Sequence, residues 1–289
     1  TPMLDRLLYA LPAGDRVDPA ISSVFLCVLL LIVPALLIGC SLPLFAGYLS
    51  RLHANSAFTR AYASYNVGAA LTALLIEFWL IRQFGIQGTV IAIAAVNATI
   101  ALVLRFGFHH LACQPAAMPA PKELSTLPTS SRQWWHCDRL DLAALVAAGI
   151  ASAIFQLLML RLAELLLGPF RETFALVVSL ILLGIAIGSL LVHWLRLRLK
   201  HALLIALIGL VLLLALLEPG ITRYAELYPT LAADYAGSVL LKWGFLALLL
   251  GLPAIGFGAT LPALLTENRD LARQSGRLLL VASLANCAG

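Results

Sequence analysis

The chain has 289 residues, of which 62% are hydrophobic and 11% are charged, and its formal net charge is +5 at pH 7. A soluble globular domain carries about 25% charged residues, so this composition excludes an ordinary water-soluble enzyme and places the long apolar runs in a bilayer. The basic residues form no stretch interleaved with aromatics, so we expect no nucleic-acid partner. The five cysteines are scattered without a CxxC pair, and we expect no metal and no cofactor in this chain.

Apolar segments long enough to cross a bilayer follow one another along most of the chain. Because about 20 apolar residues span the hydrocarbon as a helix, we predict an all-α integral membrane protein with about eight transmembrane helices in a transporter-like bundle. The segments are 21–49, 61–82, 87–106, 141–168, 172–197, 201–217, 237–265 and 274–289. The first and the seventh each contain two prolines, so we expect a spanning helix, a break and a short interfacial stretch in both.

The charges between the segments predict how the chain is oriented. If the loop 50–60 faces the cytoplasm, most of the 19 lysines and arginines also lie on the cytoplasmic side, as the positive-inside rule requires. The loop 218–236 is then external and acidic on balance, and residue 1 lies outside.

A proline-rich polar stretch divides the chain into two membrane halves. We predict a first half at 1–106, a flexible cytoplasmic linker at 107–140 and a second half at 141–289. The chain starts without a methionine and stops inside an apolar run, so we expect both halves to be truncated.

The two halves share a short motif with the same internal spacing. Its proline and glycine positions are Pro34, Gly39 and Pro43 in the first half, and Pro253, Gly258 and Pro262 in the second. Repeats of this kind are common in transporter folds. Both copies are followed by a basic loop on the same side, which favours parallel halves. We interpret the motif positions as structural.

The motif, P-x4-G-[CA]-[ST]-L-P, resembles the membrane portion of the spermidine-synthase-like (fused major-facilitator/spermidine synthase) bacterial family. Gly276-Arg277-Leu278 is similar to the start of the family's next segment, and Tyr62 and Gly68 keep its Tyr-to-Gly spacing in the first half. The resemblance covers most of the chain outside 1–20 and 107–140. The family's asparagine falls on Tyr65 and Ala282, and an acid of its opening helix falls on Gln156.

The resemblance implies a bacterial cytoplasmic membrane protein that anchors or serves an aminopropyltransferase-type domain using decarboxylated S-adenosylmethionine and a polyamine. That domain is absent from this chain, which carries no catalytic motif. The expected partners are the lipid bilayer and a soluble catalytic domain or partner protein. Two alternatives stay open: a transporter of a small charged solute such as a polyamine, and a non-catalytic membrane scaffold.

Five polar residues inside apolar segments are candidates for an intramembrane site. Glu77 either marks a functional polar site or pairs with Arg82 near the outer interface. Arg161 and Glu164 are i,i+3 neighbours that can pair on one helix face, and Gln156 lies off that face. These three either face a central cavity or form an ion pair at the membrane boundary.

Gly184 and Gly188 form a G-x-x-x-G sequence inside the segment 172–197. Small residues at this spacing let two helices approach closely. We therefore predict that both glycines serve helix packing.

Overall fold

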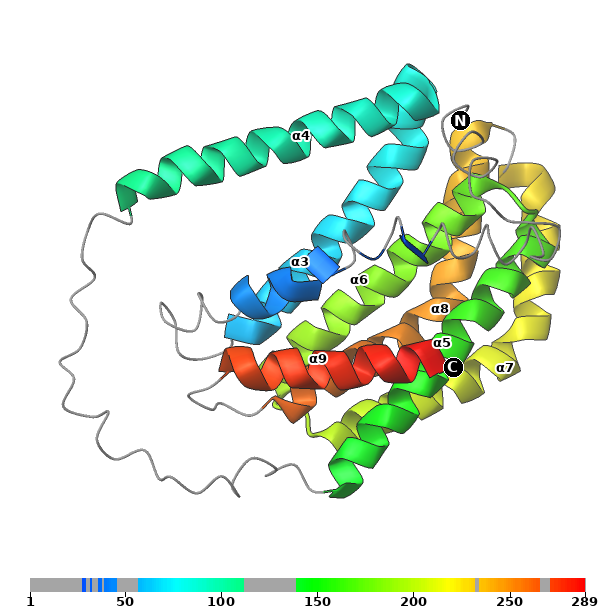
Figure 1. Ribbon diagram of the computed structural model, residues 1–289. Coiled ribbons are helices and arrows are strands. Elements are labelled where there is room, and N and C mark those ends of the chain that lie inside the picture. Colours follow the sequence, from blue (N-terminus) through cyan, green and yellow to red (C-terminus); the bar gives the residue numbers. More distant parts are fainter. Residues whose placement is uncertain are drawn as a thin grey trace, which may run out of the picture.

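The computed structural model describes residues 57–111, 139–231, 234–265 and 271–288, together with short helical pieces between 28 and 45. Every element in these ranges is a helix (Figure 1). In chain order they are α3 (Ala57–Leu75), the π-helix η1 (Ile76–Leu80), α4 (Ile81–Leu111), α5 (Arg139–Leu167), α6 (Arg171–Leu195), α7 (Leu199–Leu231), α8 (Tyr235–Leu264) and α9 (Leu271–Ala288).

Five helical runs are long and apolar enough to cross a membrane: Phe58–Gly107, Leu140–Leu167, Arg171–Leu195, Leu199–Thr230 and Tyr235–Leu264. Their apolar side chains point outward as well as inward, since many large hydrophobic residues are more than half exposed. A helix that is apolar on all sides suits a lipid environment. The predicted class, an all-α membrane protein, agrees with this arrangement.

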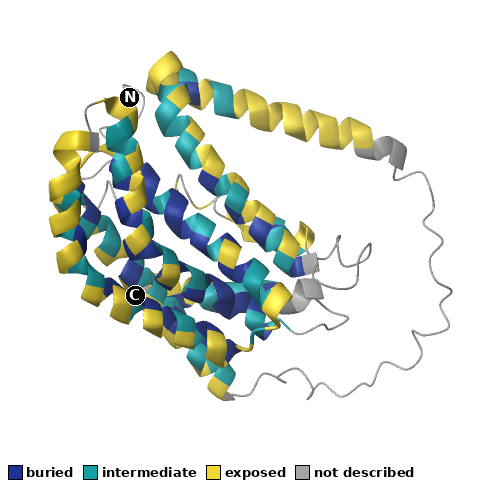
Figure 2. Ribbon diagram, turned by 180° about the vertical axis from the view of Figure 1, so that it is seen from behind, coloured by how far each residue is buried: buried dark blue, intermediate teal, exposed yellow. Residues whose placement is uncertain are grey.

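Helices α6 and α8 form the centre of the bundle. They contact each other along their length, and α3, α5 and α7 pack around them. Figure 2 shows the buried residues gathered on this central pair, whereas α4 is exposed along most of its length. The main apolar cluster includes Leu176 and Val177 of α6 and Leu249 and Leu250 of α8, all at most 2% exposed.

Glycines let the central helices touch backbone to backbone. A Cβ atom at Gly184 would collide with Ala254, one at Gly188 with the carbonyl of Ile255, and one at Gly258 with the backbone of Ile185. Without a hydrophobic driving force inside lipid, such close van der Waals packing holds helices together. Gly184 and Gly188 thus lie where α6 and α8 come closest, and their role in helix packing stays a prediction.

The apolar run from Phe58 to Gly107 is bent sharply at one residue. Gly85 has φ 64° and ψ −178°, a non-helical conformation between α3–η1 and the rest of α4. Figure 1 shows the two arms diverging from this corner. The bend lies in the gap between the predicted segments 61–82 and 87–106.

Replacing Gly85 by alanine is expected to destabilise the protein by about 1 to 3 kcal/mol, because this combination of φ and ψ is accessible essentially to glycine alone. The matched control is Gly107→Ala on the same helix, where a Cβ meets no described atom within 4 Å. Thermal unfolding in detergent measures both variants. Equal midpoints for the two would contradict the prediction.

Two sequence predictions are wrong, one about the end of α7 and one about a break within α8. Helix α7 continues to Leu231, so most of the expected external loop 218–236 is helical. The Arg223–Glu226 pair, an i,i+3 contact of 2.8 Å, supports this extension. Helix α8 also runs unbroken through Pro253 and Pro262, and Gly209 of α7 packs against the nitrogen of Pro253. A neighbouring helix at the proline makes an unbroken helix tolerable there.

The first copy of the repeat has different surroundings from the second. Pro34 lies outside the described residues. Gly39 and Pro43 are helical, but a Cβ at Gly39 would meet no described atom within 4 Å, unlike one at Gly258. Tyr62 stacks on Phe58 with ring centroids 5.5 Å apart, and Gly68 also has open space around it. Close backbone packing is therefore seen for the second copy.

Candidate functional site: an ionic cluster at one end of the bundle

An ion pair joins the starts of the two central helices. The Lys242 ammonium of α8 donates to Glu172 Oε1 of α6 at 2.7 Å, and the Tyr235 hydroxyl donates to Glu172 Oε2 at 2.8 Å. The side chains of Lys242 and Glu172 are only 9% and 18% exposed. Both oxygens of the carboxylate are thus held by α8.

The corner between η1 and α4 brings two more charged residues to the same place. The Arg82 guanidinium carbon lies 3.9 Å from the centre of the Tyr235 ring, a cation–π contact. Glu77 Oε1 of η1 lies 3.8 Å from Arg171 Nε at the start of α6. We call Glu77, Arg82, Arg171, Glu172, Tyr235 and Lys242 the ionic cluster.

Local backbone features explain why these side chains meet. The π-helical turn Ile76–Leu80 carries Glu77, and π-turns are frequent at functional sites. Gly168, with φ 94°, ends α5 and lets the chain turn into α6 at Arg171. The Asp234 side chain accepts from Gly237 N at 2.8 Å and caps α8. Three helix starts or corners therefore lie at one end of the bundle.

The electrostatics of the ionic cluster favour a bound anion over a bound cation. It contains three basic side chains and two acidic ones, so one positive charge is left over. Glu172 sits in the first turn of α6, where the helix dipole also stabilises a negative charge. A second negative group would be attracted both by the surplus positive charge of the cluster and by the positive end of the α6 helix dipole.

A cavity of about 490 Å³ adjoins the ionic cluster. Lys242 lines it, and its Nζ lies 5.5 Å from the centre of the Phe170 ring. The other lining residues are mainly apolar and aromatic: Leu166, Leu167, Phe170, Ile221, Tyr224, Ala225, Tyr228 and Phe245. This size and this combination of apolar walls with few polar groups suit a small-molecule site.

One buried hydroxyl next to the ionic cluster has no hydrogen-bond partner within the described part of the chain. Thr173 is fully buried, and among the described residues no group accepts from or donates to its Oγ1. An unsatisfied buried polar atom costs about 1 to 3 kcal/mol. Such an atom is a place where water or a polar ligand gains a hydrogen bond.

The structure separates the five predicted site residues into two groups. Glu77 and Arg82 both lie in the ionic cluster. Of the two alternatives for Glu77, the pair with Arg82 is not the contact formed, because Glu77 faces Arg171 and Arg82 covers Tyr235. Arg161 and Glu164 form the predicted pair at 3.0 Å, with the Arg161 side chain 80% exposed.

The third polar residue of α5 is satisfied within its own helix. The Gln156 side-chain amide donates to Ser152 Oγ at 3.1 Å. It is thus occupied locally, one turn before the Arg161–Glu164 pair. That Glu77, Arg82, Gln156, Arg161 and Glu164 form a functional site stays a prediction.

Sequence reasoning did not single out Lys242, Glu172 or Tyr235. The signal for Lys242 was available, since a lysine inside the run Leu240-Leu241-Lys242-Trp243 is costly in hydrocarbon unless it is paired. Its partner could not be found that way, because Glu172 is 70 residues distant in the chain.

Known proteins give no further guide to this site. A comparison of the chain with protein-family models, with curated proteins and with solved structures finds no significant match.

Proposed function

We propose that this chain is the membrane module of a spermidine-synthase-like protein in the bacterial cytoplasmic membrane, and that it anchors or serves an aminopropyltransferase-type domain. In this proposal about eight membrane helices form two related halves. The run Phe58–Gly107 then contributes two passes, because Gly85 divides it. The observation that carries the proposal is the repeated proline–glycine motif. In its second copy the motif lies at the tightest contact of the two central helices.

The test uses the protein encoded by the intact gene. Membranes that contain it are expected to form spermidine from putrescine and decarboxylated S-adenosylmethionine, with the activity in the membrane pellet. Deleting the segment described here is expected to move the activity to the soluble fraction. An intact protein that sits in the membrane without any such activity would contradict the proposal and leave the scaffold alternative.

A second candidate function is transport of a small charged solute. It is supported by the cavity of about 490 Å³ beside Lys242, which continues from a charged cluster inside a membrane bundle. Intramembrane charges of this kind commonly mark substrate or ion pathways. The surplus positive charge of the ionic cluster favours a solute with a carboxylate over a polyamine.

A flux assay in proteoliposomes tests this second function. Arg171→Gln is expected to lower uptake of a labelled amino-acid derivative by about tenfold, because it removes one of the basic side chains that favour a carboxylate, a charged contact of about 1.4 kcal/mol. Arg161→Gln is the matched control, because the Arg161 side chain is 80% exposed and its pair with Glu164 lies along its own helix. No flux above protein-free liposomes, or equal flux in both variants, would rule transport through this cluster out.

A further inference from the structure

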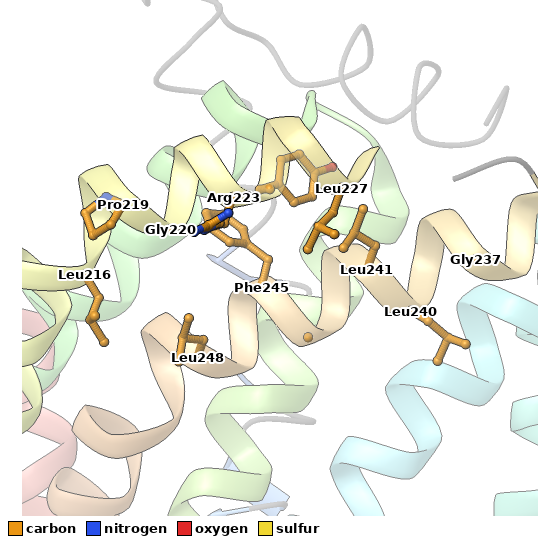
Figure 3. Close-up of a pocket in the computed structure, with 12 residues that line it drawn as sticks. Leu216, Pro219, Gly220, Arg223, Leu227, Gly237, Leu240, Leu241, Phe245 and Leu248 are labelled. Carbon is orange, nitrogen blue, oxygen red and sulfur yellow. The ribbon is translucent and has the colours of Figure 1, made fainter. Parts of the chain in front are cut away.

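An open groove of about 600 Å³ runs between α7 and α8 on the outside of the bundle (Figure 3). Leu216 reaches from α7 toward α8, and Leu248 reaches back from α8. Its walls are almost wholly apolar, with glycines in place of side chains at three points. The lining residues are Leu216, Pro219, Gly220, Arg223, Tyr224, Leu227, Gly237, Leu240, Leu241, Gly244, Phe245 and Leu248.

The groove follows α7 and α8 for about three helical turns. On α7 the lining runs from Leu216 to Leu227, and on α8 from Gly237 to Leu248, about 16 Å on each helix. Gly244 opens its floor, since a Cβ there would meet no described atom within 4 Å. Leu240 and Leu248 are 69% and 57% exposed, so the apolar groove is open to the side.

One positive charge lies on the wall of the groove. Arg223 is the single charged residue among the described residues that line the groove, and its side chain is 78% exposed. Its Nη1 donates to Glu226 Oε2 at 2.8 Å, which leaves other guanidinium N–H groups for a second acceptor. Arginine binds phosphate well, because its planar fork makes two parallel hydrogen bonds.

The inner wall closes the groove toward the ionic cluster. Tyr224 and Phe245 line both the groove and the cavity beside Lys242, and their ring centroids are 4.9 Å apart. A ligand in the groove is therefore reached from the surrounding bilayer and is separate from any solute held beside Lys242.

We propose that this groove binds an anionic phospholipid, with one acyl chain between α7 and α8 and the phosphate at Arg223. The apolar, laterally open shape takes the chain, and the arginine supplies the charge complementarity for the headgroup. This inference depends on the chain being embedded in a membrane, and it holds whether the module anchors an enzyme or moves a solute.

The test for chain binding counts retained lipids by native mass spectrometry. The protein is released from nanodiscs made of equal parts phosphatidylglycerol and phosphatidylcholine. Gly244→Leu fills the groove and is expected to lower retained phosphatidylglycerol about tenfold. Gly251→Leu is the matched control, because it lies on α8 outside the groove and also has open space around its Cβ. Both changes raise helix propensity, so the folded helix is expected to persist in each.

The headgroup is tested separately with arginine variants. Arg223→Gln is expected to abolish the preference for phosphatidylglycerol over phosphatidylcholine while lipid binding continues. Arg161→Gln is the control, since Arg161 makes the same i,i+3 pair and is equally exposed. Equal retention of the two lipids by the unchanged protein would overturn the proposal, and so would full retention in Gly244→Leu or a dimer that Gly244→Leu dissociates.

Discussion

Gly258→Leu is expected to destabilise the protein by about 3 kcal/mol, because the new side chain has no room between the two central helices. A Cβ at this position would lie 2.8 Å from the carbonyl oxygen of Ile185, and closer still to its Cα. Both are backbone atoms of α6, so no rotamer change relieves the overlap and the helices have to separate. Loss of monodisperse protein after detergent extraction, and a lowered unfolding midpoint in SDS titration, measure the effect.

The control for Gly258→Leu is Gly251→Leu, seven residues earlier on the same helix. A Cβ at Gly251 meets no described atom within 4 Å, so this change adds the same volume where α8 has open space. We expect its free energy of unfolding to lie within about 0.5 kcal/mol of that of the unchanged protein. If both variants were equally stable, α6 and α8 would not be packed through Gly258 as described.

The sequence was sufficient to predict the class of the fold, an all-α membrane protein. Long apolar runs indicate a lipid environment. The gap between the predicted segments 61–82 and 87–106 contains Gly85, and the backbone conformation at this bend is one that glycine adopts readily. The extent of α7 was missed because polar residues after Glu218 suggested a loop. In the structure Arg223 and Glu226 pair along the helix surface instead, and polarity alone does not distinguish these two outcomes.

The candidate site was predicted only in part, for a physical reason. Hydropathy and i,i+3 spacing describe one helix at a time, so they found the Arg161–Glu164 pair. They also flagged Glu77 as an unusual charge in an apolar run. They contain no information on how helices are rotated against each other, and this rotation decides that Glu77 meets Arg171 and not Arg82.

The ionic cluster and the glycine contacts join the central helices at different points along their length. Gly258 lies toward the end of α8 and sets how close α6 and α8 approach, whereas Lys242 lies near its start and sets their relative rotation. Van der Waals contact at the glycines does not depend on how the charged side chains of the two helices are aligned. A partly buried ion pair does depend on rotation, because Glu172 of α6 has to face both Lys242 and Tyr235 of α8. The two features together specify one arrangement of the pair.

Lys242→Met is expected to destabilise the protein by about 3 kcal/mol, because it leaves the partly buried Glu172 carboxylate without its ammonium partner. Glu172→Leu alone is expected to have a similar effect through the unpaired lysine. The double variant, Lys242→Met with Glu172→Leu, is expected to recover most of the loss, since apolar side chains of similar volume often replace a buried ion pair at little cost.

Unfolding midpoints of the two single variants and the double variant form a double-mutant cycle that isolates the pair. The exposed pair supplies the control: Arg161→Met removes an arginine that is 80% exposed and is expected to change stability by less than about 1 kcal/mol. Additive losses in the cycle would mean that Lys242 and Glu172 do not interact. Coupling between Lys242 and Glu172 in the cycle, together with an unchanged unfolding midpoint in Arg161→Met, would show that an ion pair stabilises this protein when it is shielded from solvent. The Lys242–Glu172 pair would then be the contact through which α8 stabilises the start of α6.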